Sequence, residues 1–433
     1  MDPISIVDRL FSHPTRRFAV QLWNGSVLAP RGPAEDGARV ILRRPRALLA
    51  LVPPVSERRL AEAFIQGDVD VQGDLVSLLE AASRWAGPDL GVASTLGAAA
   101  LSTLSELPRP LPLGRLLRGR LHSAARDTAA VRAHYDVSDP LYRLFLDPQM
   151  IYSCAYFRTG LESIDVAQQD KLRLICTKLG LRRGERFLDV GCGWGGLVCH
   201  AARAHGVRAT GITLSRHQLA EARRRIAAAP GLSAQVCACD YRDLGGLGAF
   251  DKVASVGMME HVGRTRLRAY FAAMFRALRP GGLFLNHAIA DVSPGTRTLA
   301  WARRPRGGFI DTAIFPDAEL LPIGEVITAA EEAGFEVRDL ESLREHYDRT
   351  LCAWLKRLEA GVDRAVAQVG RATVRRYRLY LGASAAAFRV GRIGIFQLLL
   401  ARRTESGRAN GLPWSREPWY PPTPDPAPIG GAR

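Results

Sequence analysis

A short glycine-rich loop between an apolar strand and a helix constrains this chain more than any other feature. Residues 187–190, Phe-Leu-Asp-Val, are typical of a buried strand, and residues 191–196, Gly-Cys-Gly-Trp-Gly-Gly, supply a turn before a helical segment. Glycines let the backbone turn tightly and approach a ligand closely, and the first turn of the following helix offers free N–H groups. The loop therefore predicts a ligand site at the carboxyl end of this strand.

Strand-like and helix-like segments alternate after residue 165. Short apolar segments that are typical of strands occupy residues 186–193, 208–215, 234–240, 251–262 and 283–290. Segments of helix length separate them. Because strands that alternate with helices form βαβ units, we predict an α/β fold with a doubly wound, mostly parallel sheet. Such sheets bind ligands at the carboxyl ends of their strands, which is where the glycine loop lies.

Composition divides the 433 residues into four regions. Residues 1–88 combine short strand and helix patterns and predict a small α+β domain. Residues 89–127 are rich in Gly, Pro, Ala, Ser, Leu and Arg and predict a basic linker. Residues 128–410 carry the α/β pattern, and residues 411–433, with seven Pro, predict a disordered tail.

The formal net charge of +16 favours an anionic partner, either a membrane surface or a nucleic acid. The longest uncharged stretch, residues 90–105, is too short and too weakly apolar to span a membrane. The amino terminus carries an acid at its second position and lacks the pattern of a signal peptide. Seven cysteines without a CxxC pair favour a reduced cytoplasmic protein over a disulfide framework, and we predict no metal site.

The spacing of the glycines separates two classes of cofactor. Dinucleotide-binding loops have the pattern GxGxxG, whereas this loop has GxGxGG and follows Asp189 on the same strand. This arrangement resembles the first motif of class I S-adenosylmethionine (SAM) methyltransferases, in which the acid helps to orient the amino acid end of the cofactor. The resemblance implies a Rossmann-like, seven-stranded sheet that binds SAM through Asp189, Gly191, Gly193 and Gly195.

Later positions complete the implied cofactor site. Those methyltransferases commonly end their second strand with an acid that holds the ribose, but here Thr213 and Leu214 stand at that place, and Gln218 on the next helix can supply the polar contact. Asp240, Tyr241 and Arg242 follow the third strand and are expected to border the adenine. Tyr152 and Ser153, which precede the sheet, are also expected to bind the cofactor. For the positions after the second and third strands, simple turn and cap roles are the alternative.

Several further blocks narrow the resemblance to one family. They occupy residues 134–147, 152–157, 257–263, 286–289, 315–322 and 346–354. In order and spacing they are similar to the signature of the cyclopropane-fatty-acyl-phospholipid synthase family, which is related to the mycolic acid cyclopropane synthases. Residues 38–52 and 62–75 resemble, more loosely, the lipid-facing amino-terminal domain of that family.

The resemblance implies transfer of a methylene group from SAM to the double bond of an unsaturated acyl chain in a membrane phospholipid. The alkene attacks the methyl group of the sulfonium, which is chiefly a task of positioning, and leaves a carbocation that aromatic faces such as Tyr156 and Phe157 can stabilise. In this family a bound bicarbonate ion is the base that removes the final proton. The positions implied to hold it are Cys154, Glu260, His287, Ile289 and Tyr347. Ser384 stands where the family usually has a cysteine sometimes proposed as catalytic.

Two other functions remain open at this point. One is a SAM-dependent C-methyltransferase that gives a branched or otherwise modified product without a cyclopropane ring. The other is a catalytically silent protein that binds lipid or nucleic acid, although no recognised nucleic-acid module is present. The family resemblance favours the synthase, bound peripherally to an anionic membrane on the cytoplasmic side, as a homodimer and without a nucleic-acid partner.

Overall fold

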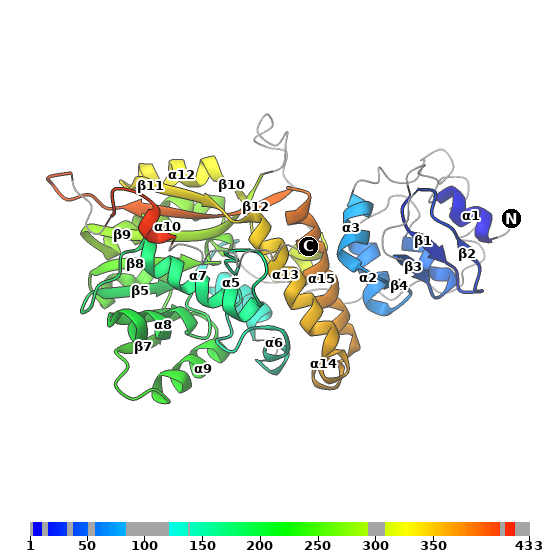
Figure 1. Cartoon of the computed structure of the whole chain (residues 1–433), viewed down its shortest axis with the longest axis horizontal. Coiled ribbons are helices and arrows are strands. Elements are labelled where there is room, and N and C mark those ends of the chain that lie inside the picture. The colour runs from blue at the N-terminus through cyan, green and yellow to red at the C-terminus, as the bar shows by residue number, and fades with distance from the viewer. Residues whose placement is uncertain are drawn as a thin grey trace, which may run out of the picture. The chain divides into compact units, whose positions relative to one another are not determined.

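The computed structural model describes residues 3–10, 16–32, 38–50, 57–83, 121–136, 139–292, 308–407 and 412–420. The chain divides into two compact units (Figure 1). The first consists of Met1–Arg118, Ser293–Pro316 and Leu351–Arg392, and the second of Gly119–Val292, Asp317–Thr350 and Ile393–Arg433. Residues 89–120 of the predicted linker lie outside the described residues.

A small mixed sheet forms the centre of the first unit. Its strands are β1 (Ala19–Gln21), β2 (Val27–Leu28), β3 (Arg39–Leu42) and β4 (Val69–Gln72), in the order β2-β1-β3-β4. The β1–β3 pair is parallel and the other pairs are antiparallel. The amino-terminal helices and turns of this unit are α1 (Pro3–Leu10), η1 (Pro45–Ala50), α2 (Glu57–Gln66) and α3 (Leu75–Ser83). Residues of β3 alternate between half-buried and buried, as expected of a strand with one face on the core.

Helices from later in the chain belong to this first unit. They are α11 (Phe309–Ala313), the second part of α13 (Arg344–Ala360), α14 (Val362–Val369) and α15 (Arg371–Arg389). The buried Arg375 on α15 donates to the backbone oxygens of Phe64 at 2.6 Å and Val69 at 2.8 Å. Its guanidinium also lies 4.4 Å from the centre of the Phe64 ring. Residues Leu351–Arg392, which the sequence analysis places in the 128–410 domain, therefore pack with the amino-terminal strands and helices instead.

The second unit is built on a large, mostly parallel sheet. Its strands are β5 (Arg186–Val190), β6 (Arg208–Thr213), β7 (Ala234–Ala238), β8 (Phe250–Val256), β9 (Leu278–Asp291), β10 (Leu321–Pro322), β11 (Glu336–Ser342) and β12 (Ile393–Ala401). Seven of them follow the order β11-β12-β9-β8-β5-β6-β7, and the two-residue β10 pairs with β9. Only the pairs that involve β12 are antiparallel among these described strands. The predicted doubly wound α/β fold is confirmed.

Helices cover both faces of this sheet (Figure 1). The helices and turns are α5 (Ala124–Tyr135), α6 (Asp139–Phe145), α7 (Ile164–Lys178), α8 (Gly196–His205), α9 (Arg216–Ala227), η2 (Tyr241–Leu247), η3 (Met259–His261), η4 (Arg264–Arg266), α10 (Leu267–Ala277), α12 (Ile323–Glu332) and η5 (Glu417–Trp419). Successive residues of β5 point to opposite faces, so Phe187 packs in a core with α7 and α8, and Leu188 in a core with α10 and α12. The predicted boundary between residues 127 and 128 falls inside α5. No helix within the described ranges is long and apolar enough to cross a membrane.

Part of the carboxy-terminal segment packs onto the second unit. The sequence predicts disorder from residue 411, but the structure describes residues 412–420, and Trp419 is only 7% exposed there. Its ring packs in the core with α7 and α8, and Nζ of the fully buried Lys178 lies 5.8 Å from the ring centre. Arg416 forms an ion pair with Asp339, which Lys178 Nζ also contacts at 3.3 Å. The prediction of disorder rested on the number of prolines and gave no weight to Trp419, a large apolar side chain that is buried.

Trp419→Ala is expected to destabilise the second unit by about 3 kcal/mol, because it removes a buried aromatic ring and leaves a cavity beside Lys178. Urea unfolding followed by circular dichroism measures the change. Trp414→Ala is the matched control, since Trp414 lies five residues earlier and is fully exposed. Equal midpoints for the two variants would show that the segment does not contribute to the stability of the unit.

Candidate active site

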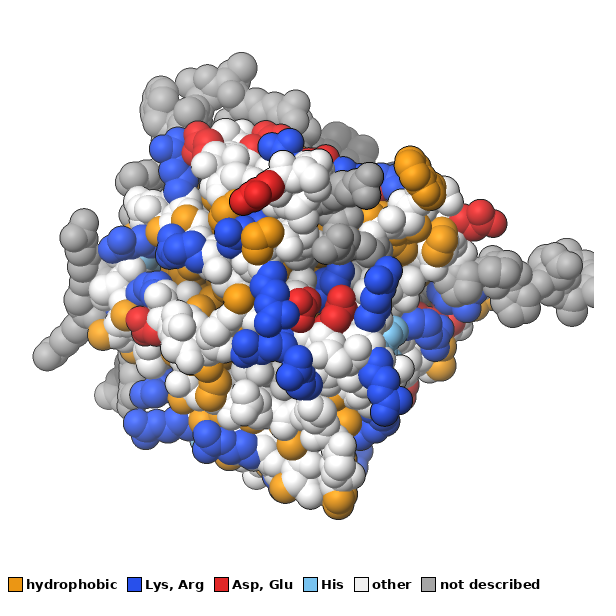
Figure 2. All heavy atoms as spheres, turned by 90° about the vertical axis from the view of Figure 1, so that its left-hand side faces the viewer, with side chains coloured by type: hydrophobic (Ala, Val, Ile, Leu, Met, Phe, Trp, Pro, Cys, Tyr) orange, Lys and Arg blue, Asp and Glu red, His pale blue; other side chains and the backbone are white. Residues whose placement is uncertain are grey.

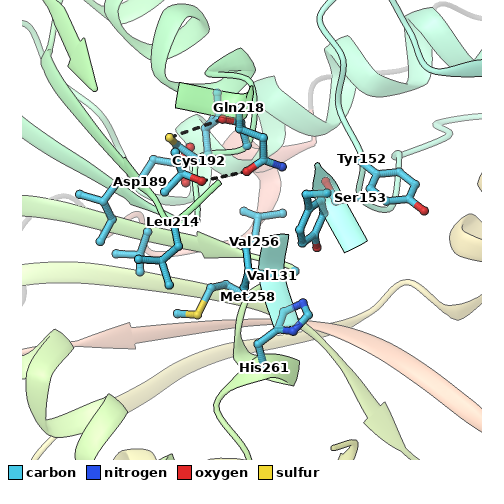
Figure 3. Close-up of a pocket in the computed structure, with 18 of the residues that line it drawn as sticks. Val131, Tyr152, Ser153, Asp189, Cys192, Leu214, Gln218, Val256, Met258 and His261 are labelled. Carbon is cyan, nitrogen blue, oxygen red and sulfur yellow. Dashed lines mark hydrogen bonds between the residues drawn. The ribbon is translucent and has the colours of Figure 1, made fainter. Parts of the chain in front are cut away.

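A pocket opens at the carboxyl ends of β5, β6 and β8 (Figure 3). The predicted cofactor residues that line it are Tyr152, Ser153, Asp189, Gly191, Gly193, Thr213, Leu214, Gln218, Asp240, Tyr241 and Arg242. In Figure 3, Asp189 and Leu214 lie on one side of the pocket and Tyr152 and Ser153 on the other. Gly195, also predicted to bind the cofactor, is not among the lining residues.

The glycine loop has the backbone conformation that its composition predicts. Gly191, Gly193 and Gly195 have φ values of 82°, 53° and 82°, in the left-handed region that other residues rarely adopt. A Cβ on Gly191 would stand 2.9 Å from Met258 Cγ, beside the pocket. A Cβ on Gly195 would stand 3.0 Å from Ala222 Cβ on α9. Gly191 thus keeps the backbone close to the pocket, whereas Gly195 allows α8 to begin against α9.

Gly191→Ala should weaken SAM binding and lower the thermal midpoint, because it adds a collision with Met258 to a backbone strain of about 1–3 kcal/mol. Calorimetry with SAM and a thermal melt measure the two effects. Gly231→Ala is the control: its φ is 83°, close to that of Gly191, but no atom lies within 4 Å of the added Cβ. Equal effects of the two substitutions would show that the close approach to Met258 is not the reason for a glycine at position 191.

Asp189 is the buried acid of the pocket. It is 2% exposed at the end of β5, and its Oδ1 has no hydrogen-bond partner among the described residues. Burial raises the pKa of Asp189 to about 7, and the nearby Lys171 opposes that rise. A buried carboxylate without a partner is costly unless a ligand supplies one. The geometry therefore favours a cationic or hydrogen-bond-donating ligand group at this oxygen.

Helix α7 supplies two polar residues that the sequence analysis missed. Lys171 donates from Nζ to Ser153 Oγ at 3.0 Å, and Gln168 donates from Nε2 to the Ser153 backbone oxygen at 2.9 Å. Both side chains are buried, and burial lowers the pKa of Lys171 to about 8. Their spacing of three residues, among apolar positions of a predicted helix, is the signal that could have identified them. They hold the Ser153 segment against the pocket.

The residues after β6 form a hydrogen-bonded turn. Thr213 Oγ1 donates to Gln218 Oε1 at 2.8 Å, and Ser215 caps α9 by accepting from the Gln218 backbone N–H at 3.2 Å. Ser215 Oγ also donates to Asp136 Oδ1 at 2.5 Å. The turn leaves the amide nitrogen of Gln218 as the donor that can face a ligand, because its oxygen is occupied by Thr213.

The residues after β7 combine a cap role with a place on the pocket wall. Asp240 accepts from the Arg242 backbone N–H at 3.0 Å and so caps η2. Arg242 lies 5.0 Å from the centre of the Tyr241 ring and pairs with Asp240 and Asp127. Asp127 belongs to α5, so the helix at the end of the predicted linker closes this side of the pocket. The cap interpretation and the ligand interpretation of Asp240 are compatible.

Aromatic side chains surround the opposite wall. Tyr152 makes edge-to-face contacts with Tyr135 and Tyr142, at ring separations of 6.3 Å and 5.1 Å. Tyr135 also meets His261, at 6.1 Å. Tyr135 and His261 line the pocket; they fall within the family blocks 134–147 and 257–263, but sequence reasoning gave neither of them a role.

A second polar set, made of residues implied to hold bicarbonate, lies at the ends of β8 and β9. Glu260, on η3, is buried and accepts from the Ile289 backbone N–H at 2.8 Å through Oε1. Burial raises the pKa of Glu260 to about 7. His287, two residues before Ile289 on β9, is fully buried, and burial lowers its pKa well below the usual value. The imidazole is therefore neutral near pH 7.

Two atoms of this set remain available to a ligand. Glu260 Oε2 and His287 Nε2 are buried and have no hydrogen-bond partner within the part of the chain that is described. His287 Nδ1 lies 3.2 Å from Gln397 Nε2, on the neighbouring strand β12. If Gln397 donates, the proton of the imidazole resides on Nε2, which then points a donor away from Gln397. One acceptor and one donor of this kind suit a small oxyanion that carries one proton.

The remaining members of the implied set connect through Leu343. Cys154 Sγ lies 3.8 Å from the Leu343 backbone oxygen, and the Tyr347 backbone N–H donates to the same oxygen at 3.1 Å. The Leu343 N–H donates to Ile395, which is paired in register with Ile289. These contacts connect Cys154 and the start of α13 to strand β12, which pairs with β9. Burial raises the pKa of the Cys154 thiol, so the thiol is neutral.

Ser384 belongs to the first unit. It is half-buried on α15, which belongs to the first unit. Its proposed role in place of a family cysteine therefore stays a prediction.

Comparison with known proteins assigns the chain to a family. The family model "Mycolic acid cyclopropane synthetase" matches residues 122–398. The chain belongs to this family. This cyclopropane synthetase family member is 39% identical to a "Probable fatty acid methyltransferase" of Pseudomonas putida over 403 residues, which is 93% of this chain and 95% of the relative. It is 37% identical to the "Cyclopropane-fatty-acyl-phospholipid synthase" of Escherichia coli over 287 residues, 66% of this chain and 71% of the relative.

A solved structure of the same family contains SAH. The crystal structure of mycolic acid cyclopropane synthase CmaA1 complexed with SAH and CTAB has a TM-score of 0.59 and 35% identity, and covers 63% of this chain and 97% of its own. SAH is SAM without its transferable methyl group. The residues of this cyclopropane synthetase family member fit SAM, because Asp189 offers an unpartnered buried oxygen and the glycine loop leaves room for close approach. The chain is a SAM-dependent methyltransferase.

Proposed function

We propose that the chain is a cyclopropane fatty acid synthase that transfers a methylene group from SAM to the double bond of an unsaturated acyl chain in a membrane phospholipid. The observation that carries the proposal is the pair of unpartnered buried atoms, Glu260 Oε2 and His287 Nε2, among the polar residues at the ends of β8 and β9. Attack of an alkene on the methyl group of SAM leaves a carbocation that must lose a proton, and a buried acceptor and donor suit that step. The name of the Escherichia coli relative supports the same substrate class.

The residues of the cofactor pocket would hold and orient SAM. SAM supplies an electrophilic methyl group on a sulfonium when bound. Asp189 would hold its amino end, Gln218 its ribose, and the segment from Asp240 to Arg242 would border the adenine. Lys171 and Gln168 fix Ser153 by hydrogen bonds of 3.0 Å and 2.9 Å, so this wall is preorganised.

The second polar set would manage the proton that ring closure releases. Bicarbonate would supply the base when bound. Glu260 Oε1 is occupied by the Ile289 N–H, which leaves Oε2 to accept the hydrogen of the anion, and His287 Nε2 to donate to one of its other oxygens. Glu260, with a pKa raised to about 7 by burial, is suited to hold or release a proton near neutral pH.

The second candidate function is a C-methyltransferase of unsaturated acyl chains that forms a branched product. The long match to the fatty acid methyltransferase of Pseudomonas putida favours it, since that relative covers 93% of this chain. Expression in a bacterium whose own cyclopropane synthase gene has been deleted separates the two. The synthase predicts phospholipid acyl chains heavier by one CH₂ group, with cyclopropane protons at high field in the NMR spectrum. A branched methyl signal alone would support the second candidate.

The proposed membrane partner is an anionic lipid surface. Figure 2 shows basic side chains spread over one face of the second unit, and the exposed arginines of this unit include Arg182, Arg183, Arg208 and Arg403. The sequence places further arginines in the linker, although Arg126 at its end is paired with Asp317 at 2.6 Å. Attachment to the cytoplasmic face of the membrane and a homodimeric state, both expected from the family, stay predictions.

Binding to anionic vesicles should weaken by at least tenfold when salt rises from about 50 mM to about 500 mM, because the attraction is screened. A vesicle co-sedimentation assay measures it. Changing the linker residues Arg109, Arg115, Arg118 and Arg120 to Gln should weaken binding more than changing Arg182, Arg183, Arg208 and Arg403, which removes the same charge. Vesicle binding that is independent of salt would show that electrostatic attraction does not contribute to it.

A further inference from the structure

A cluster of one thiol and two imidazoles lies outside the two polar sets described above. Cys176, on α7, is fully buried, and His200 and His205, on α8, are half-buried. One potential ligand atom from each of the three lies within 4.8 Å of the other two. The sequence separates Cys176 from the histidines by more than twenty residues, and only the packing of α7 against α8 brings them together.

We propose that Cys176, His200 and His205 form a binding site for a transition-metal ion of the zinc class. A thiolate with two imidazoles is a donor set that Zn²⁺ prefers, and three protein ligands leave one tetrahedral position for water. The two half-buried histidines lie on the more exposed side of the cluster, so the open position faces solvent and gives the ion a path of entry.

The geometry needs only a small contraction to hold the ion. Ligand atoms around tetrahedral zinc stand about 3.3–3.7 Å apart, given Zn–S of about 2.3 Å and Zn–N of about 2.0–2.1 Å. Both histidines lie in the last two turns of α8, which ends at His205, so rotation of their side chains can close the difference from 4.8 Å without moving the strands. The rings are already tilted toward one another, with centroids 6.4 Å apart.

One contact beside the cluster supports the assignment. His205 hydrogen-bonds the backbone carbonyl of Leu181, the kind of outer contact that fixes the ring of a metal-binding histidine. Arg173, Arg203 and Lys171 lie near His200 and oppose the positive charge of an ion, so binding depends on the negative charge of a Cys176 thiolate.

The site would connect metal binding to the cofactor pocket. Cys176 lies near enough to Asp189 and Lys171 to interact with both electrostatically, and Lys171 is on the same helix. Helix α7 carries the residues that hold Ser153, and α8 begins directly after the glycine loop. An ion that ties α7 to α8 would therefore stabilise the wall and the floor of the pocket.

Titration of the full-length, reduced and tag-free chain with Co²⁺ tests the site. The expected result is one Co²⁺ per chain, with a sulfur-to-cobalt charge-transfer band in the near ultraviolet and the intense visible bands of tetrahedral cobalt, both removed by excess Zn²⁺. Zn²⁺ should also raise the thermal midpoint. Cobalt binding without the charge-transfer band would overturn the proposal, because it would place the ion away from Cys176.

Variants separate the site from incidental binding. Cys176→Ala should abolish the charge-transfer band, and His200→Gln should weaken Co²⁺ binding at least about tenfold. Cys199→Ala and His217→Gln are the matched controls, since Cys199 adjoins His200 on α8 and His217 is exposed on α9. If Cys176→Ala fails to fold, His200→Gln alone decides through loss of the Zn²⁺-dependent rise in thermal midpoint. Retention of the band in Cys176→Ala, or of the full midpoint rise in His200→Gln, would overturn the assignment.

Discussion

Glu260→Gln should lower the rate of lipid modification by about 100-fold to 10,000-fold, the range expected when a group that handles the transferred proton is lost. The amide keeps the size of the side chain and can still accept from the Ile289 N–H, which lies 2.8 Å from Oε1. It cannot accept the hydrogen of a bound anion at the other position if its NH₂ points there. Turnover with saturating SAM and unsaturated vesicles measures the rate, and calorimetry should show SAM affinity nearly unchanged.

Stability distinguishes this loss of activity from unfolding. The folded pKa of Glu260 is raised to about 7 from an ordinary value of 4.5, so above pH 7 the ionised carboxyl in its buried place costs folding free energy. Gln carries no charge, so at pH 8 the variant should melt no lower than the wild type. Glu332→Gln, an exposed change on α12, is the control for activity. Full turnover by Glu260→Gln would contradict the proposed proton-handling role.

Asp189→Asn should raise the dissociation constant for SAM by about 10-fold to 100-fold, because a hydrogen bond to a charged group contributes about 1.5–3 kcal/mol. Asp189 is 2% exposed, and the substitution preserves its shape, so the loss reflects charge. Calorimetry with SAM measures it. Asp243→Asn is the control, since Asp243 is exposed on η2 and does not line the pocket.

The pH dependence of SAM binding follows from the same residue. Burial raises the pKa of Asp189 to about 7, so the free protein loses the carboxylate as pH falls through 7. SAM affinity of the wild type should therefore decrease below pH 7, while the affinity of Asp189→Asn should stay flat over that range. A wild-type affinity independent of pH between about 6 and 8 would show that the cofactor does not depend on this charge.

The fold of the second unit was predictable because each of its early elements carries its own local signal. The strand pattern of residues 186–193 and the glycines after it match β5 and the start of α8 within a few residues. The grouping of residues Leu351–Arg392 with the first unit was not predictable, because it depends on long-range packing of α15 against α2 and α3, which includes the hydrogen bonds of Arg375. Trp419 was missed for a similar reason, since Lys178, whose Nζ lies against its ring, is far away in the sequence.

The cofactor site likewise contains residues that could be predicted from the sequence and residues that could not. Residues at strand ends, such as Asp189 and Thr213, could be predicted because topology alone brings strand ends together. Lys171 and Tyr135 could not, because their approach depends on how α7 and α5 pack over the sheet. The Cys176 cluster was likewise missed, because Cys176 has no second cysteine beside it and only the packing of α7 against α8 brings it to His200 and His205.

Transfer from SAM with a fully deuterated methyl group tests the central claim most directly. The purified chain, incubated with this SAM and vesicles of an unsaturated phospholipid, should give cyclopropanated acyl chains that retain CD₂, because ring closure removes one deuteron from the transferred methyl. Mass spectrometry and NMR of the released fatty acids read the label. An acyl chain that carries an intact CD₃ branch, or no transfer to lipid at all, would contradict the account.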